Sequence, residues 1–419
     1  MIESFRRPSS PLSPSLLILL VLVALCDGAA VVAGSGIDRR SAAPAEEDTS
    51  STSTSASSST YTFNPLATNL NIVYYGQSNI TANVSLDAIC SDDSVDVIIL
   101  GFIRQFYGSG GKNNKSINIT LEFAGDLCSS TASSAQVEAG QPGLLDCVST
   151  GFADRIASCQ TKGKKVLISA GSASGDLYIP SKKDAGKLTT MLWNLFLGGT
   201  SDSKTKDLRP FGTDVVLDGF DLDNENATNA KYLPNLISLL RKKMKKDKAK
   251  PKRQYYVSAA PICALAEFSS DQEIPVSKLI NDIDFWNVQF YNAQACQVGS
   301  GDGFTSSLKQ WSELLLNGRR VQCEGSTCTV PKGKFNTIDN GITYPRLLIG
   351  SRSFYTGVEN RGYVDVQTYR DILKDDVKTL DLPNLAGAMW WDGTYLEESA
   401  EEVEGLGNVT FAEVVREVL

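Results

Sequence analysis

Carboxylates recur at short spacing between Gly212 and Asn226, where the sequence reads GTDVVLDGFDLDNEN. Asp221, Asp223 and Glu225 are two residues apart, and residues with this spacing share one face of a β-strand. Three neighbouring carboxylates repel each other and resist ionisation, so the outermost one should have a raised pKa. This pattern favours a catalytic site. An acidic strand end that is only hydrated, or that binds a cation, is the alternative.

The residues around these acids are typical of a buried strand. Val215 to Leu217, Phe220 and Leu222 are apolar, and several are β-branched. Asp218 lies three residues before Asp221, so its side chain should point away from the acidic face. Gly219 could form a bulge between the two. The full spacing of the acids is D-x-x-D-x-D-x-E.

Composition narrows the chemistry that is available. The chain has 419 residues, of which 42% are hydrophobic and 21% charged, as in an ordinary soluble globular protein. Its net charge of −8 argues against a nucleic acid partner. The sequence contains no histidine, which excludes Ser-His and Cys-His nucleophile pairs and any metal site with histidine ligands. An enzyme of this composition must use carboxylates, Tyr, Lys or Cys.

The N-terminal region has the pattern of a secretory signal peptide. Arg6 and Arg7 precede an apolar run from Leu16 to Cys26, and small residues follow at 28–30. We therefore expect residues 1–30 to be a signal peptide and the protein to be secreted, to the extracellular space or the cell wall. An uncleaved anchor is the alternative, although the run is shorter than the roughly 20 residues of a membrane span. Residues 31–60 are rich in Ser and Thr and predict a disordered linker.

Eight apolar runs alternate with amphipathic segments from residue 61 to the end of the chain. This alternation predicts one α/β domain, a TIM (β/α)8 barrel over residues 61–419. A doubly wound open sheet is the alternative, but no G-x-G-x-x-G follows any strand. The expected strands are Asn71–Tyr75, Val95–Phe102, Lys165–Ser169, Val215–Asp223, Tyr255–Ala260, Phe285–Gln289, Arg346–Gly350 and Leu385–Trp391. The expected helices are Cys147–Lys162, Lys187–Leu197, Lys231–Lys246, Val276–Ile283, Thr305–Leu316, Tyr363–Leu373 and Thr410–Leu419.

Short motifs in a fixed order extend the pattern across roughly residues 70–395. They are IVYYGQ (72–77), KKVLISAG (164–171), LWNLFLGG (192–199), RPFG (209–212), LDGFDLDNE (217–225), SAAPIC (258–263), NVQFYN (287–292) and AMWW (388–391). With these motifs the sequence resembles the class III chitinases of the hevamine type, in glycoside hydrolase family 18. The D-x-x-D-x-D-x-E spacing is the signature of that family.

The resemblance implies a role for each site residue. Glu225 matches the general acid, Asp223 the carboxylate that holds the acetamido group of the substrate, and Asp221 the inner partner that shares charge or a proton with Asp223. Tyr291 matches a tyrosine that contacts the acetamido oxygen, and Trp391 matches the tryptophan under the cleaved sugar, although Trp390 is adjacent. Further substrate contacts are expected at Gln289, Tyr75, Gln77 and Asp218.

The resemblance also implies a reaction. In family 18 the acetamido oxygen of the substrate attacks the anomeric carbon, with retention of configuration and without a metal or organic cofactor. The expected partner is chitin or chito-oligosaccharides, bound by a monomer with no nucleic acid and no stable membrane insertion after signal cleavage. Two alternatives use the same barrel: an endo-β-N-acetylglucosaminidase that cuts N-glycan cores, and a non-catalytic lectin or inhibitor.

Cysteines and sequons fit a secreted glycoprotein. Of nine cysteines, Cys26 leaves with the signal peptide, and the even remainder indicates disulfides. The resemblance implies the pairs Cys90–Cys159, Cys128–Cys147 and Cys263–Cys296, which leaves Cys323 and Cys328 to pair with each other. N-glycosylation sequons start at Asn79, Asn83, Asn114, Asn118, Asn226 and Asn408.

Two residues depart from the family pattern. Ser172 stands where glycine is usual after the third strand, at a turn that could require positive φ. Asn224 replaces a large apolar residue between Asp223 and Glu225, so it puts a polar group where the strand should pack on a helix.

Overall fold

The computed structural model describes residues 61–78, 84–108, 116–125, 127–265, 273–323, 326–334, 340–357 and 361–419, all within one unit that runs from Ser59 to Leu419. The predicted signal peptide (1–30) and linker (31–60) lie outside the described residues and stay predictions. The same holds for the sequons at Asn79, Asn83 and Asn114.

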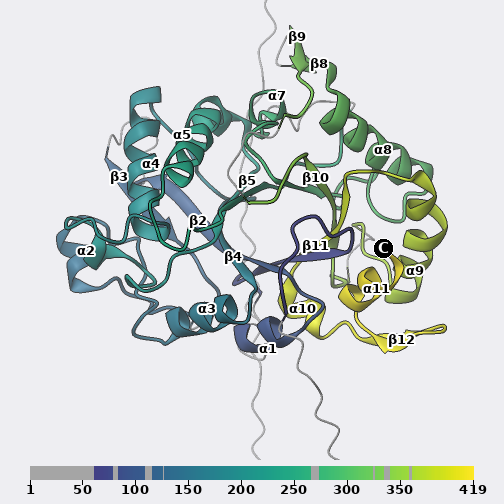
Figure 1. Ribbon diagram of the computed structural model, residues 1–419, viewed down its shortest axis with the longest axis horizontal. Helices are drawn as coiled ribbons and strands as arrows, with labels where there is room; N and C mark the ends of the chain where they lie inside the picture. The colour runs from purple at the N-terminus through teal and green to yellow at the C-terminus, as the bar shows by residue number, and fades with distance from the viewer. Residues whose placement is uncertain are drawn as a thin grey trace, which may run out of the picture. The chain divides into compact units, whose positions relative to one another are not determined.

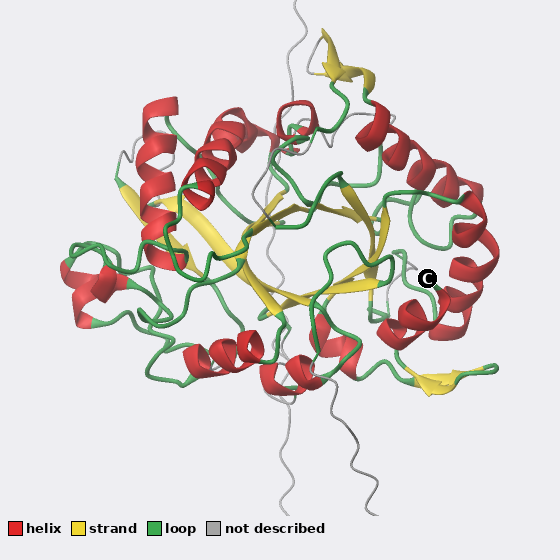
Figure 2. Ribbon diagram, in the orientation of Figure 1, coloured by secondary structure: helices red, strands yellow, loops and turns green. Residues whose placement is uncertain are grey.

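Eight parallel strands form a closed barrel. The hydrogen-bonded order is β1-β11-β10-β7-β6-β5-β4-β2, and a pairing of β1 with β2 closes the ring, which is visible in Figures 1 and 2. The TIM-barrel prediction is therefore confirmed, and the open sheet is excluded by the closure. The strands are β1 (Leu70–Tyr75), β2 (Val97–Tyr107), β4 (Lys165–Ser172), β5 (Gly219–Asn224), β6 (Tyr256–Ala259), β7 (Phe285–Gln289), β10 (Arg346–Arg352) and β11 (Leu385–Trp391).

Helices surround this ring, as Figure 2 shows. Each predicted helix is present, with shifted ends. For example, α4 begins five residues earlier than expected, because the Ser181 side chain caps it by accepting a hydrogen bond from the Asp184 amide. The main helices are α1 (Leu86–Ser91), α3 (Phe152–Thr161), α4 (Lys182–Phe196), α5 (Leu233–Lys245), α7 (Val276–Leu279), α8 (Asp302–Asn317), α9 (Val366–Asp371), α10 (Gly393–Glu397) and α11 (Phe411–Val418).

Smaller elements decorate the barrel and were not predicted. Strand β3 (Ile117–Leu121) pairs antiparallel with the extended end of β2. Two hairpins, β8 (Arg319–Cys323) with β9 (Ser326–Val330) and β12 (Glu401–Val403) with β13 (Gly407–Val409), stand apart from the main sheet, and α2 (Ser134–Glu138) lies between β3 and α3 in the chain. None of the helices that the structure describes combines the length and apolar character needed to cross a membrane.

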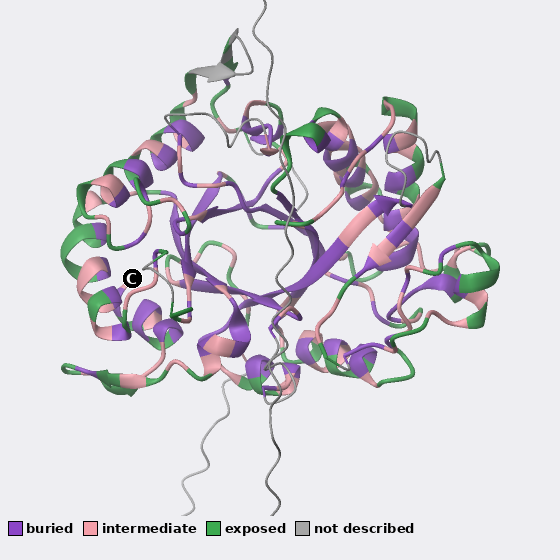
Figure 3. Cartoon of the chain, turned by 180° about the vertical axis from the view of Figure 1, so that it is seen from behind, coloured by how far each residue is buried: buried purple, intermediate pink, exposed green. Residues whose placement is uncertain are grey.

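Strand residues alternate between two apolar layers. On β1, Leu70, Ile72 and Tyr74 point into the barrel, whereas Val73 and Tyr75 pack between the barrel and the helices. Figure 3 shows the strands of the ring as mostly buried. Because both faces are buried, the strands read as unbroken apolar runs, and the sequence alone does not mark which residues face inward.

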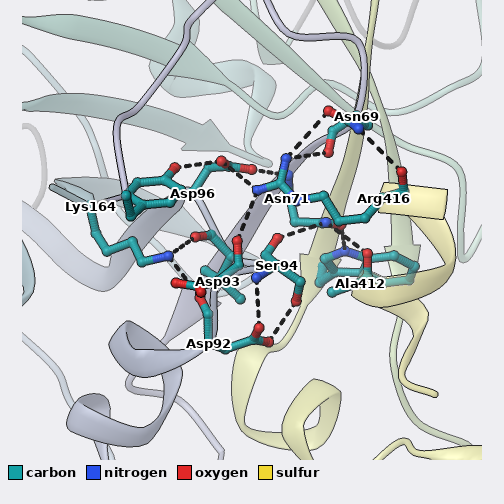
Figure 4. Close-up of polar contacts among 12 residues, drawn as sticks. Asn69, Asn71, Asp92, Asp93, Ser94, Asp96, Lys164, Ala412 and Arg416 are labelled. Atoms are coloured by element: carbon teal, nitrogen blue, oxygen red, sulfur yellow. Dashed lines mark hydrogen bonds and ion pairs between the residues drawn. The ribbon is translucent and has the colours of Figure 1, made fainter. Parts of the chain in front are cut away.

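A polar network lies near the starts of β1 and β2, on the side of the barrel that faces α11 (Figure 4). Asp96, only 2% exposed, accepts hydrogen bonds from the Asn71 amide (2.7 Å) and from Arg416 of α11 (2.6 Å). Lys164, 1% exposed, donates to the carbonyl oxygens of Asp92 and Val95. The Arg416–Asp96 contact attaches α11 to the barrel. It lies at the end where the strands begin, opposite to the end where the strands finish.

Three of the four expected disulfides are present: Cys90–Cys159, Cys128–Cys147 and Cys263–Cys296. The third joins the loop after β6 to the loop after β7. The side chains of Cys323 and Cys328, in the β8–β9 hairpin, lie outside the described part of the chain, so their pairing stays a prediction.

Candidate active site

The acidic strand is β5, and it pairs regularly with its neighbours. Gly219 aligns with Leu167 on one side and Tyr256 on the other, without the bulge that the sequence suggested. A Cβ on Gly219 would lie 1.9 Å from the Tyr256 carbonyl oxygen, so glycine is needed for close approach. Gly171 of β4, at φ +137°, has the same role, because its Cβ would lie 1.8 Å from the Asp223 carbonyl oxygen.

Asp221 is fully buried and is held by hydroxyl groups from three other strands. Ser169 of β4 (2.6 Å), Tyr74 of β1 (2.8 Å) and Ser258 of β6 all donate to its carboxyl oxygens. Burial raises the pKa of Asp221, and these three hydrogen bonds oppose the rise because they stabilise the carboxylate. Among the described residues no cluster is arranged to hold a metal ion.

Asp223 is next along the same face, and Glu225 follows just beyond the strand. Asp223 is 5% exposed and accepts a hydrogen bond from the Gln289 amide (3.0 Å). Burial, followed by the negative charges of Glu225 and Asp221, raises the pKa of Asp223 well above its ordinary value. Desolvation also raises the pKa of Glu225, with Gln289 opposing it. The outermost carboxyl thus has the raised pKa that the acidic pattern predicts.

A pocket of about 260 Å³ opens where the strands end. This volume is slightly below the roughly 300–1,000 Å³ of sites for drug-sized ligands, and suits one sugar ring at a time. Six predicted site residues line it: Glu225, Asp223, Tyr291, Trp391, Gln289 and Gln77. Its other lining residues are Phe102, Ser172, Ala173, Ser174, Asn292 and Arg352.

The two adjacent tryptophans of β11 face opposite ways. The Trp391 ring lines the pocket and stacks on Phe102, with a centroid distance of 5.9 Å. Trp390 is fully buried on the outer side, where its indole N–H donates to Asn71 (2.8 Å) and its ring contacts Phe411. Only Trp391 can therefore offer a ring face to a ligand.

Comparison with known proteins agrees with this geometry. Residues 71–336 match the sequence pattern of the protein family described as Glycosyl hydrolases family 18. Endochitinase 3 of Metarhizium robertsii is 33% identical over 367 residues, which are 87% of this chain and 93% of that protein. The chain belongs to glycosyl hydrolase family 18.

Solved structures with the family 18 barrel include both a chitinase and an inhibitor. The ICChI chitinase from Ipomoea carnea matches with a TM-score of 0.57 and 22% identity, over 84% of this chain and 100% of that one. A xylanase and α-amylase inhibitor protein from Scadoxus multiflorus matches with a TM-score of 0.56 and 22% identity, over 83% and 98%. At these identities the likeness shows the fold alone.

Two residues expected to contact substrate lie elsewhere in this family 18 barrel. Tyr75 points outward, where its hydroxyl donates to the Val84 carbonyl (3.2 Å), whereas its neighbour Tyr74 points into the barrel and donates to Asp221. Asp218 lies before β5, at the opposite end of the barrel. It accepts hydrogen bonds from Gln160 (2.7 Å) and from the Val166 amide (3.0 Å). Both predictions were wrong, because the Tyr75 side chain lies on the outer face of β1 and Asp218 lies at the end of the barrel where β5 begins.

Tyr291 and Gln77 are placed by the ends of β7 and β1. Tyr291 is 7% exposed, and burial together with the charges of Asp223 and Glu225 raises its pKa well above the ordinary value, so it stays a phenol. The Gln77 amide nitrogen donates to the carbonyl oxygens of Gly101 (3.0 Å) and Glu122 (2.9 Å). These bonds fix the Gln77 side chain at the pocket wall.

Both departures from the family pattern have structural consequences. Ser172 adopts φ 90°, the positive region that glycine tolerates best. The buried Asn224 amide donates to the carbonyl oxygens of Asn226 (2.9 Å) and Glu273 (2.6 Å), so it anchors the segment that leads into α7. This contact brings Glu273 near Glu225. Burial and the Glu225 charge raise the pKa of Glu273 to about 7.

Proposed function

We propose that this family 18 member is an endo-acting chitinase that hydrolyses β-1,4-linked N-acetylglucosamine with retention of configuration. The observation that carries the proposal is the convergence of Asp223, Glu225, Tyr291 and Trp391 on one pocket at the C-terminal ends of the barrel strands. Its relative in Metarhizium robertsii is named an endochitinase. In this proposal the protein is a secreted monomer, and its substrate is chitin or soluble chito-oligosaccharides.

In the first step the cleaved sugar stacks on Trp391, and Asp223 and Tyr291 hold its acetamido group. The acetamido oxygen attacks the anomeric carbon and forms an oxazolinium ring, while the protonated Glu225 gives its proton to the departing glycosidic oxygen. In the second step the Glu225 carboxylate takes a proton from water. The resulting hydroxyl adds to the anomeric carbon, the ring opens, and Glu225 is protonated again.

The inner carboxyl, Asp221, sets the charge state of this site. Its three hydroxyl donors favour the ionised form, so the proton of the pair resides on Asp223. Asp223 can then hydrogen-bond to the acetamido group without adding a second full negative charge beside Glu225. The raised pKa of Glu225 keeps more of it protonated, as a general acid requires.

The test compares wild type with Glu225→Gln on N-acetylchitotetraose and on a high-mannose glycopeptide, with products read by mass. We expect wild type to cleave the tetrasaccharide, and Glu225→Gln to lower kcat by at least about a hundredfold while binding persists. Glu138→Gln, at an exposed position of α2, is the matched control.

Three other outcomes of this assay would each contradict a different part of the proposal. Binding of the tetrasaccharide by wild type without cleavage would indicate a lectin or inhibitor, the non-catalytic alternative on this barrel. Cleavage of the glycopeptide alone would indicate an endo-β-N-acetylglucosaminidase. Full activity in Glu225→Gln would remove Glu225 from the role of general acid.

A further inference from the structure

A guanidinium group lies in the wall of the active-site pocket without a carboxylate partner. Arg352, the last residue of β10, lines the pocket beside Tyr291 and Trp391. Its guanidinium carbon lies 4.7 Å from the centre of the Phe354 ring, and its buried Nε has no hydrogen-bond partner. In the part of the chain that the structure describes, no ion pair joins Arg352 to an acidic residue.

A second hollow, of about 690 Å³, adjoins this pocket at Asn292, which lines both. Its walls are held together by a hydrogen bond from the Asn292 amide to the Arg361 carbonyl oxygen (2.9 Å). The hollow is lined by Asn292, Gln294, Gln297, Val298, Gly299, Ser300 and Arg361. None of these lining residues is acidic. Among the residues that the structure describes, the hollow therefore offers one cation together with amide and hydroxyl groups.

The two arginines act on each other as like charges. Burial lowers the pKa of Arg352, Tyr291 opposes this shift, and the positive charge of Arg361 adds to it. An anion bound between them would relieve both effects. A guanidinium group binds carboxylate and sulfate oxygens through two parallel N–H donors, so arginine is suited to that role.

We propose that Arg352 and Arg361 form a subsite for an anionic group on a sugar next to the one that is cleaved. The substrate class is then an N-acetylglucosamine-containing glycan that carries a sulfate or a carboxylate on a neighbouring unit. The acetamido sugar still occupies the pocket above Asp223, and the charged neighbour extends past Asn292 into the second hollow. This inference rests on the proposed function, because it names the substrate of that same site.

The experiment measures kcat/KM for three tetrasaccharides at low salt: neutral N-acetylchitotetraose, the same chain with one 6-O-sulfate, and the same chain with one uronic acid. The readout is the ratio of kcat/KM for each anionic chain to that for the neutral chain. We expect Arg361→Gln and Arg352→Gln each to lower this ratio about tenfold for at least one anionic chain. Arg352→Lys, which keeps the charge but not the paired donors, should lower it less.

Arg320→Gln, at an exposed position of β8, is the matched control and should leave the ratio unchanged. Added salt should reduce the wild-type ratio, because the contact at Arg361 is exposed to solvent. A thermal melt of each variant shows whether it folds. Arg361→Gln replaces an exposed side chain, so it keeps the test valid if Arg352→Gln does not fold.

The outcomes separate this inference from the proposed function. If wild type cleaves the neutral chain and the ratio is the same in all arginine variants, the anionic subsite is refuted while the chitinase proposal stands. If wild type cleaves none of the chains, the chitinase proposal fails. Binding of the sulfated and uronic acid chains, measured by calorimetry on wild type and Arg361→Gln, then still decides whether the arginines bind an anion.

Discussion

The Tyr74 hydroxyl is one of three donors that hold the Asp221 carboxylate, and Tyr74→Phe removes it without removing the ring. The ring of Tyr74 contacts Phe102 and Trp391, at centroid distances of 5.8 and 5.6 Å, and phenylalanine preserves these contacts. The change therefore isolates the 2.8 Å hydrogen bond from Tyr74 to Asp221. Ser169 and Ser258 remain as donors, so the ionised form of Asp221 is less stabilised but keeps two hydrogen bonds.

A hydrogen bond to a charged group contributes about 1.5–3 kcal/mol. Loss of the Tyr74 donor removes that stabilisation from the ionised form, so it should raise the pKa of Asp221. The proton shared by the pair then moves from Asp223 towards Asp221, and Asp223 presents a negative charge beside Glu225. If the reactive state requires the proton on Asp223, kcat should fall about 10–100-fold, with little change in KM because Trp391 is unaltered.

The assay is steady-state hydrolysis of N-acetylchitotetraose by wild type, Tyr74→Phe and Tyr75→Phe from pH 4 to 8. Tyr75 is the matched control, because its hydroxyl donates to the Val84 carbonyl on the outer side of the same strand. We expect Tyr75→Phe to keep the wild-type kcat. Wild-type turnover in Tyr74→Phe, or an equal loss in both variants, would refute the assignment of the proton to Asp223.

Three further predictions concern backbone strain, stability and pH. Ser172→Gly should raise the free energy of unfolding by up to about 1 kcal/mol, seen as a higher Tm, because φ 90° strains serine. Arg416→Gln should lower that free energy by about 3 kcal/mol in denaturant titration, because it leaves the buried Asp96 without its cation. Glu273→Gln should move the alkaline limb of kcat to lower pH by about half a unit. Burial and then repulsion by Glu225 raise the pKa of Glu273 to about 7, and the same repulsion favours protonation of Glu225, which must be protonated to act as an acid.

Much of the fold could be predicted because the barrel strands are short apolar runs with long helical segments between them. All eight strands and their order along the chain were predicted, as were the carboxylates of β5, since residues two apart on a strand must share a face. Strand ends also located most of the pocket. Gln77, Gln289, Tyr291 and Trp391 each end or follow a strand, and all line it.

The errors arose where local sequence does not determine direction. Tyr74 and Tyr75 are both buried aromatic residues, and only the register of β1 against its neighbours places Tyr74 inside. Asp218 belongs to the acidic motif by spacing, yet its parity already placed it on the other face of β5. Arg352 was missed because the expected strand ended at Gly350, two residues before the end of β10, and Glu273 comes near Glu225 through the Asn224 contact, which no motif indicates.

The charge balance of the site connects these observations. Asp221 accepts three hydroxyl donors, and in the proposed mechanism Asp223 carries a proton, so neither carboxyl needs a counter-ion. Arg352 lines the same pocket, yet no ion pair joins it to an acid in the described part of the chain. The Phe354 ring stabilises this cation, with the guanidinium carbon 4.7 Å from the ring centre, but a ring face does not use both of its paired N–H donors. An anionic group on a neighbouring sugar would accept from those donors, and the anionic tetrasaccharides measure what that contact contributes.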